Sequence, residues 1–100
     1  MSVVADSREF QIDLPRTRVG AMSSQSIIAK QHADASMAAK TALYPPQTIR
    51  DLNGRSYQVS YCITLRCAIE DAAQTFSEVF YVAHDLTGCD AILRKNAGTA

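Results

Sequence analysis

The sequence predicts a mainly β domain with one helix, and three observations lead to this fold class. From Tyr57 to Ile69 an apolar side chain stands at every second residue, which is the pattern of a half-buried antiparallel strand. Asn53-Gly54 separates that run from a shorter apolar one and is a strong hairpin signal. One alanine-rich segment has a composition typical of a helix. A chain of 100 residues corresponds to a single domain, residues 1–100.

The N-terminal half is predicted to contain a short edge strand and then the helix. Phe10, Ile12 and Leu14 alternate with polar residues until Pro15 interrupts the run, as in a short strand at the edge of a sheet. The helix is predicted from about Ser24 to Lys40, where a pair of serines supplies the N-cap and alanine is frequent.

The C-terminal half is predicted to be entirely β. A strand over 47–52 leads into Asn53-Gly54, which we expect to form a type I′ turn with a positive φ at both residues. The long strand follows, and a polar break at 70–74 turns the chain back. Residues 75–83 read as a central strand because both faces are apolar near its end, and residues 90–93 form a last short strand.

Charge and hydropathy exclude several kinds of partner. Ten basic and ten acidic residues give a formal net charge of zero without a run of like charges, so no nucleic-acid partner is expected. No apolar run approaches the roughly 20 residues that span a bilayer, and the first fifteen residues lack a secretory signal. We expect a soluble, intracellular, cytoplasmic protein without a membrane partner. A chain this short buries only a modest core, which favours a homodimer.

The residues that commonly bind metals or form disulfides do not suggest a cofactor. Cys62, Cys67 and Cys89 are odd in number and lack the spacing of a zinc site, so they are predicted to be free, buried thiols. His32 and His84 have no ligand partner three or four residues away. We expect neither a metal nor another cofactor, and the absence of a Gly-x-Ser-x-Gly sequence disfavours a serine hydrolase.

Two segments of the C-terminal half together resemble a known family. They are TIRDLNGRSYQVSYCITLRC and TFSEVFYVAHDLTGCDAIL, and their order is similar to that of the retropepsin-like aspartic protease domains of long-terminal-repeat retrotransposons. The resemblance implies a small closed β-barrel in which a flap-like hairpin, with Asn53 and Gly54 at its tip, covers the substrate. Relative to the family, the chain is expected to be truncated after Asn96, without the terminal helix.

The catalytic Asp-Thr/Ser-Gly tripeptide of this family is missing. The segment Val19-Gly20-Ala21-Met22-Ser23-Ser24 is similar to the family's catalytic segment, and in that register Arg18 occupies the aspartate position. A second register places Asp13 there, with the residues from Leu14 to Val19 inserted. Neither register restores the tripeptide.

The resemblance implies an aspartic endopeptidase that contributes one aspartate per subunit of a homodimer and takes a peptide or polyprotein substrate. Asp13 is then the candidate catalytic residue, and Asn53 and Gly54 are candidate substrate-binding residues. Because two carboxylates must share a proton in this chemistry, the missing tripeptide predicts an inactive enzyme. Two alternatives stay open: a non-catalytic β-rich dimerisation or protein-interaction module, and a fragment of a polyprotein.

Overall fold

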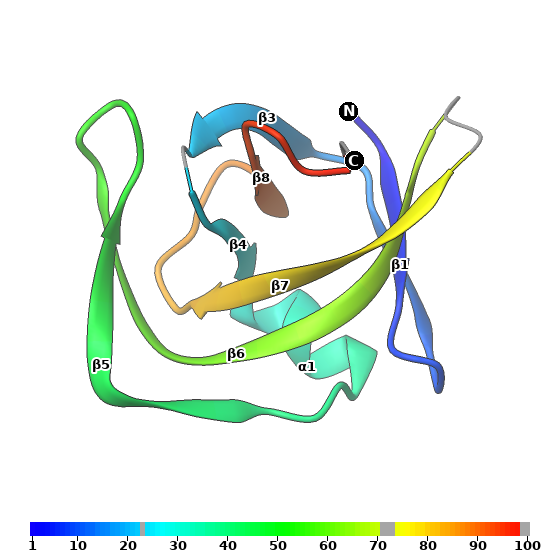
Figure 1. Ribbon diagram of the computed structural model, residues 1–100, viewed down its shortest axis with the longest axis horizontal. Coiled ribbons are helices and arrows are strands. Elements are labelled where there is room, and N and C mark those ends of the chain that lie inside the picture. The colour runs from blue at the N-terminus through cyan, green and yellow to red at the C-terminus, as the bar shows by residue number, and fades with distance from the viewer. Residues whose placement is uncertain (23, 71–73, 99–100) are drawn as a thin grey trace.

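The computed structural model describes residues 1–22, 24–70 and 74–98, and the chain in these ranges is mainly β (Figure 1). The predicted fold class, mainly β with one helix, is confirmed. In chain order the elements are β1 (Val3–Asp6), β2 (Gln11–Leu14), β3 (Thr17–Met22), β4 (Ser26–Ala29), α1 (Lys30–Ser36), β5 (Thr41–Arg50), β6 (Ser56–Ile69), β7 (Thr75–Ala83) and β8 (Ala91–Arg94).

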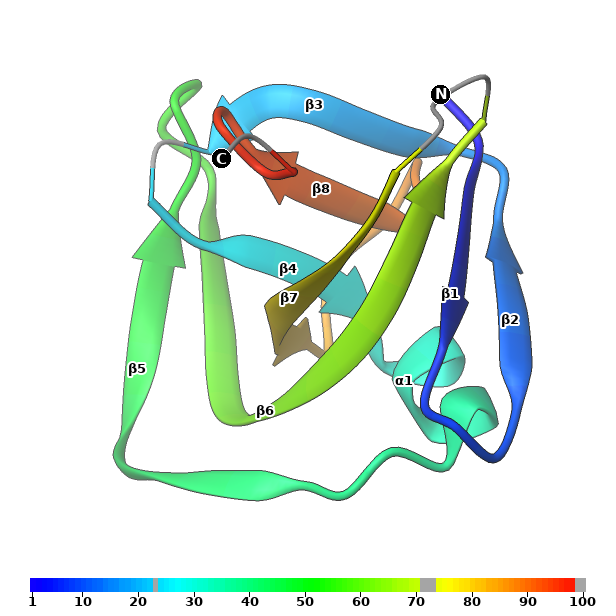
Figure 2. The same ribbon diagram turned by 45° about the vertical axis from the view of Figure 1, so that its right-hand side comes forward.

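The strands form one strongly curved sheet that does not close into a barrel. Its order is β2-β1-β6-β7-β4-β8-β3, with β5 paired to β6 outside this path. In Figure 2, β6 sweeps from β5 on the left to β1 on the right, and β2 forms the right-hand edge. Because β2 and β3 end the path without pairing to each other, the closed barrel that the resemblance implied is not formed by the described strands.

The long predicted strand is confirmed as β6, which contributes to both parts of the core. Tyr57 and Val59 at its beginning pack with Ile49 and Ile92 in one buried cluster. Its second half contributes to the larger buried cluster, with Ile63, Leu65 and Cys67 facing inward. The register shifts between Val59 and Cys62, so the strand bends there and its two halves reach different clusters.

The predicted helix over Ser24–Lys40 is wrong at its beginning and its end, because α1 covers only Lys30–Ser36. Ser26 to Ala29 instead form β4, in which all four residues are buried. β4 pairs with β7 along one edge and with β8 along the other. The β-branched side chains of Ile27 and Ile28 favour such a central strand. Packing between neighbouring strands therefore overrides the helical tendency of the segment.

Three further differences concern the strands. β1 and β3 were not predicted. β1 has only four residues, VVAD, in a stretch of mixed polarity, and Arg18 and Gly20 interrupt the apolar positions of β3. β5 begins at Thr41 and not at 47, and so runs through Pro45 and Pro46. These prolines are exposed and lie where the pairing of β5 with β6 is interrupted, between Ala42 and Gln47, so no ladder hydrogen bond is lost there.

Candidate functional site

The segment that carries the family resemblance near the C-terminus ends in β8, which lies between β3 and β4. β8 runs parallel to β3, with Arg18 opposite Ile92, and antiparallel to β4, with Ile27 opposite Ile92. The C-terminal end of β3, the N-terminal end of β4 and the β5–β6 hairpin lie on the same side of the molecule (Figures 1 and 2). A ligand held under the hairpin would therefore lie near these two strand ends.

This part of the chain has no carboxylate. Between Leu14 and Ala33 the sequence contains neither aspartate nor glutamate. Arg18, which takes the aspartate position in one register, is an exposed residue of β3. The other residues of that register include Ser23, which lies outside the described residues. No alignment register within this stretch can place an acid beside the hairpin.

Asp13, the other catalytic candidate, lies at a different place. It is exposed on β2 and stands opposite Val4 of β1, at the edge strand on the right in Figure 2, whereas the hairpin is at the upper left. Among the described residues its side chain has no hydrogen-bond or ion-pair partner. The fold therefore does not bring Asp13 together with Asn53 and Gly54 within one chain.

The hairpin tip has a different turn from the type I′ turn that was predicted. Gly54 has a φ of 84°, but Asn53 does not have a positive φ. The amide of Gly54 donates to the carbonyl of Asp51, and the amide of Asp51 donates to the carbonyl of Arg55. The connection is thus a three-residue loop in which a type I turn ends at a left-handed glycine.

The side chain of Asp51 holds this loop in place. Its Oδ1 accepts hydrogen bonds from the amides of Asn53 and Arg55, both at 2.9 Å, and its Oδ2 accepts one from the hydroxyl of Tyr57 at 3.2 Å. Aspartate favours the first position of such turns because its carboxylate can bind amides of the turn. Asn53 and Gly54 remain exposed at the tip, where a partner could reach them.

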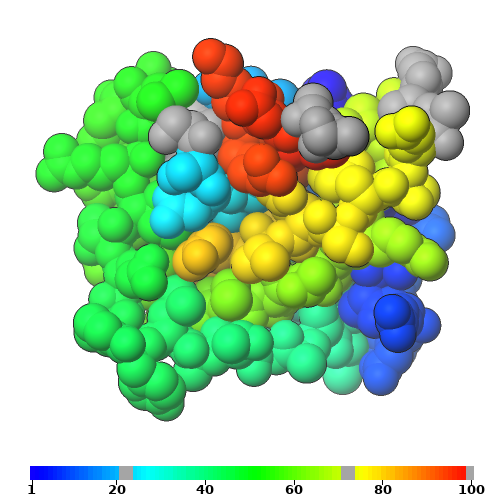
Figure 3. Space-filling view, viewed as in Figure 1, coloured from blue at the N-terminus to red at the C-terminus, as the bar shows by residue number. Residues whose placement is uncertain are grey.

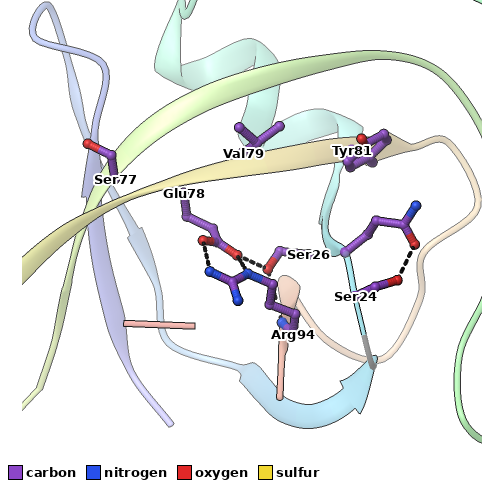
Figure 4. Close-up of a pocket in the computed structure, with 8 residues that line it drawn as sticks. Ser24, Ser26, Ser77, Glu78, Val79, Tyr81 and Arg94 are labelled. Carbon is purple, nitrogen blue, oxygen red and sulfur yellow. Dashed lines mark hydrogen bonds and ion pairs between the residues drawn. The ribbon is translucent and has the colours of Figure 1, made fainter. Parts of the chain in front are cut away.

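The most structured polar cluster lies in a pocket formed by β4, β7 and β8 (Figure 4). Arg94 Nε donates to Glu78 Oε2 at 2.9 Å and Nη2 donates to Oε1 at 3.3 Å. The hydroxyl of Ser26 donates to Glu78 Oε2 at 2.5 Å and accepts from the backbone amide of Arg94 at 2.9 Å. The pocket has a volume of about 380 Å³ and is also lined by Ser24, Gln25, Ser77, Val79 and Tyr81.

The chemistry of this cluster suits binding better than catalysis. Ser26 is completely buried, so its hydroxyl cannot attack a substrate. Glu78 is 5 % exposed and its charge is balanced by the bidentate contact with Arg94. With neither a free nucleophile nor a free base, the cluster fixes the three strands together and presents the remaining N–H groups of Arg94 to the pocket.

A second buried carboxylate, Asp90, connects three parts of the fold. Its Oδ2 accepts from the backbone amide of Arg16 at 2.9 Å, and its Oδ1 lies 3.0 Å from His32 Nε2 on α1. Burial raises the pKa of Asp90, but the Arg16 amide, His32 and the charge of Arg16 lower it more strongly, so the net shift is downward. Asp90 therefore joins the β2–β3 turn and α1 to the beginning of β8.

The three cysteines are free, as predicted, and two of them are buried. Burial raises the pKa of the Cys67 thiol to about 12. Burial also raises the pKa of Cys89, although the charges of Arg18, Arg16 and Arg55 partly oppose this shift. Because the thiolate is the reactive form, neither residue is poised to act as a nucleophile. Cys62 is half-buried.

The described ranges hold no cluster of metal-binding side chains. In residues 1–22, 24–70 and 74–98, no three histidine, cysteine, aspartate or glutamate side chains come together in a way that could hold an ion. His32 contacts Asp90, and His84 lies edge-on to the ring of Tyr61 with a centroid distance of 6.3 Å. Within the same ranges, no helix is both long and apolar enough to cross a bilayer.

Comparison with known proteins gives no family assignment. No family model matches the chain, and searches of curated proteins and of solved structures found no match. The retropepsin resemblance therefore rests on the sequence segments alone.

The residues that form the pocket were not predicted from the sequence. A signal was present for Glu78, because it follows the period-two alternation of Phe76, Phe80 and Val82 and must therefore face inward. A carboxylate at such a position requires a buried partner, which is Arg94. The contact between Asp90 and His32 gave no local signal, because 58 residues separate them in the chain.

Proposed function

We propose that this chain is a retropepsin-like domain of retrotransposon origin that has lost peptidase activity. The order of elements supports the resemblance: a hairpin with glycine at its tip, a long strand, a returning strand and a short last strand follow one another in a single curved sheet. The observation that carries the proposed loss of activity is the stretch from Leu14 to Ala33, which contains no carboxylate and includes the ends of β3 and β4 on the hairpin's side of the molecule.

The absence of a carboxylate between Leu14 and Ala33 matters because of how aspartic proteases work. Aspartic proteases need two carboxylates close together, one to activate water and one to protonate the substrate carbonyl. The resemblance implies a homodimer in which each subunit supplies one of them across a two-fold axis. A subunit that presents Arg18 in place of the aspartate would bring two guanidinium groups together at that axis, where they repel each other and cannot accept a proton.

The proposed location of the domain is cytoplasmic. Its three cysteines are unpaired, and free thiols are typical of reducing compartments. Fractionation of cells that express the tagged chain tests this location, and recovery in the secretory pathway would contradict it.

Activity is tested with the purified chain and an unfolded protein substrate between about pH 4 and about pH 6, where aspartic proteases work. We expect no cleavage above the rate without protein, with or without pepstatin. Pepstatin-sensitive cleavage that disappears in Asp13→Asn would overturn the proposed inactivity and assign the catalytic role to Asp13. Cleavage that persists in Asp13→Asn would indicate a contaminating protease.

A second candidate function is a non-catalytic dimerisation or protein-interaction module. It is favoured by the edges of the sheet, because among the described strands β2 and β3 end the strand order and β5 pairs only with β6. Such edges present unpaired backbone groups to a partner strand. Sedimentation equilibrium measures the solution mass: a dimer that does not cleave peptides supports this function, whereas a strict monomer over a wide concentration range counts against a self-pairing module.

A further inference from the structure

The tip of the β5–β6 hairpin presents two neighbouring residues that can react with each other. In an Asn-Gly pair the backbone nitrogen of glycine can attack the side-chain amide carbon of asparagine, because glycine has no Cβ and adopts backbone conformations that other residues avoid. Asn53 and Gly54 are exposed, and apart from chain neighbours no atom lies within 4 Å of where a Cβ of Gly54 would stand. In Figure 3 the green atoms of the hairpin form the upper left corner of the molecule.

The side chain of Asn53 is not held by the rest of the described chain. Its backbone amide donates to the carboxylate of Asp51 at 2.9 Å, but among the described residues no group hydrogen-bonds its side-chain amide. An exposed side chain changes rotamer rapidly, so the amide carbon can turn toward Gly54. Ammonia that leaves this carbon can pass directly into water.

The hydrogen bonds of the loop oppose the reaction. The amide of Gly54 donates to the carbonyl of Asp51 at 3.1 Å, and this bond must open before the nitrogen can lose its proton and attack. The carboxylate of Asp51 keeps the loop closed by accepting from the amides of Asn53 and Arg55 and from the hydroxyl of Tyr57. Because the loop is short and lies at the surface, its local opening costs only part of the free energy of global unfolding.

The other asparagine of the chain, Asn96, provides a comparison within the same molecule. Both asparagines are exposed, and each is followed by a residue whose amide donates at 3.1 Å to the carbonyl three residues earlier, Gly54 to Asp51 and Ala97 to Arg94. Ala97, however, carries a Cβ and packs against the larger buried cluster. The reaction is therefore expected at the hairpin and not at Asn96.

We propose that Asn53 is a site of spontaneous deamidation and that the loop held by Asp51 controls its rate. The Gly54 nitrogen loses its proton and bonds to Cγ of Asn53, while the bond from Cγ to the side-chain nitrogen breaks and ammonia leaves. The product is a five-membered succinimide. Water opens this ring either at Cγ, which gives aspartate, or at the backbone carbonyl carbon, which gives isoaspartate. The net reaction consumes one water and releases one ammonia.

Both products change the hairpin tip. Each places a new carboxylate close to that of Asp51, and like charges at short distance repel each other. In isoaspartate the main chain also runs through Cβ and Cγ, so an additional atom separates residue 53 from Gly54 and the three-residue loop cannot keep its hydrogen bonds unchanged. This inference uses the loop alone and does not depend on the proposed function.

The test is incubation of the folded chain at mildly alkaline pH, with samples taken over time and digested at acidic pH to stop the reaction. We expect a mass increase of about 1 Da in the peptide that contains Asn53, because a carboxyl group replaces an amide, and no increase in the peptide that contains Asn96. Methylation of the same samples by an isoaspartyl carboxyl methyltransferase with labelled S-adenosylmethionine identifies the isoaspartate product.

Variants separate the chemistry from its control by the loop. Gly54→Ala should slow deamidation by at least about tenfold, both in the folded chain and in urea, because the Cβ hinders the attack in either state. Asp51→Ala should accelerate it by about fivefold or more in the folded chain only, since the hydrogen bonds that close the loop are lost. The matched control Glu9→Ala removes an exposed carboxylate between β1 and β2 and should leave the rate unchanged.

Three results would overturn the proposal. The first is an unmodified Asn53 in the folded chain after the chain in urea has reacted completely. The second is deamidation of Asn96 at the same rate as Asn53 or faster. The third is an equal rate in Asp51→Ala and Glu9→Ala, which would remove the role of the loop.

Discussion

Glu78 of β7 and Arg94 of β8 form a bidentate ion pair across the pocket, with N–O distances of 2.9 and 3.3 Å. The two strands are not neighbours in the sheet, because β4 lies between them and contributes Ser26 to the same cluster. The side chain of Glu78 is 4 % exposed and that of Arg94 is 36 % exposed. The ion pair therefore connects β7 to β8 across β4, the strand that lies between them in the sheet.

Removal of the cation should destabilise the chain strongly. Arg94→Met leaves the buried carboxylate of Glu78 without its charged partner, so we expect a loss of about 3 to 5 kcal/mol in the free energy of unfolding. Urea titration followed by circular dichroism measures it. Lys95→Met, at the exposed neighbouring residue, should change stability by less than about 0.5 kcal/mol.

The double variant Glu78→Leu/Arg94→Met provides the complementary test. Replacing both partners removes the unpaired charge, so most of the stability lost in Arg94→Met should return. A double variant as unstable as Arg94→Met would mean that the guanidinium stem, and not the charge of Glu78, accounts for the loss.

Acid stability should depend on Asp90. Because the folded state lowers the pKa of Asp90 below its ordinary value of 3.8, its contribution to stability is complete above that value and is lost as pH falls through the folded-state pKa. Asp90→Asn should be less stable than the wild type at neutral pH and should lose less further stability on acidification. Thermal unfolding across this pH range measures both effects.

Asp13→Asn is the matched control substitution, since Asp13 is exposed on an edge strand. At neutral pH its stability should differ from that of the wild type by less than about 0.5 kcal/mol. Parallel pH profiles of the wild type and Asp90→Asn would contradict the assignment to Asp90.

The hairpin tip offers a test of its turn type. Gly54→Ala should cost about 1 kcal/mol, because alanine is disfavoured at a φ of 84° although nothing lies within 4 Å of its added Cβ. Asn53→Ala should cost less than about 0.5 kcal/mol, since Asn53 has no positive φ. A type I′ turn would instead make both substitutions costly, so equal losses would contradict the three-residue loop.

Thiol labelling should distinguish the three cysteines. Cys67 is completely buried, and burial raises the pKa of its thiol to about 12, so it should resist iodoacetamide in the folded chain. Cys89, with 7 % exposure and a raised pKa, should also react slowly. Cys62 should be labelled first, because it is half-buried. Peptide mass spectrometry reads out each site, and labelling in urea should modify all three.

The fold could be predicted from the sequence where a long, continuous run of residues carried a clear hydrophobic pattern. β6 followed from its period-two pattern, β7 from the apolar residues on both of its faces near its end, and the position of the hairpin from Asn53-Gly54. β4 could not be predicted in this way, because Ile27 and Ile28 lie in an alanine-rich context that favours helix, and only the pairing with β7 and β8 makes the segment a strand. The turn type depended on the carboxylate of Asp51, whose role appears only once the loop geometry is known.

The candidate site was less predictable than the fold. The family resemblance pointed to Asp13 and Arg18, whereas in the structure the buried carboxylates Glu78 and Asp90 pair with Arg94 and His32, respectively. Glu78 could have been found from its inward-facing position between Phe76 and Phe80. The partners of Asp90 could not, because contacts between residues 58 and 74 positions apart depend on the complete topology.

The position of β8 between β3 and β4 has a consequence for how the chain acquires its structure. Among the described strands, β3 pairs with β8 alone, so Thr17–Met22 must wait for Ala91–Arg94 before it can join the sheet. Closing a loop of this length is entropically costly and slows folding. During synthesis, the early strand would thus remain unpaired until the ribosome has released the last one, and a chaperone that shields it would have the longest time to act there.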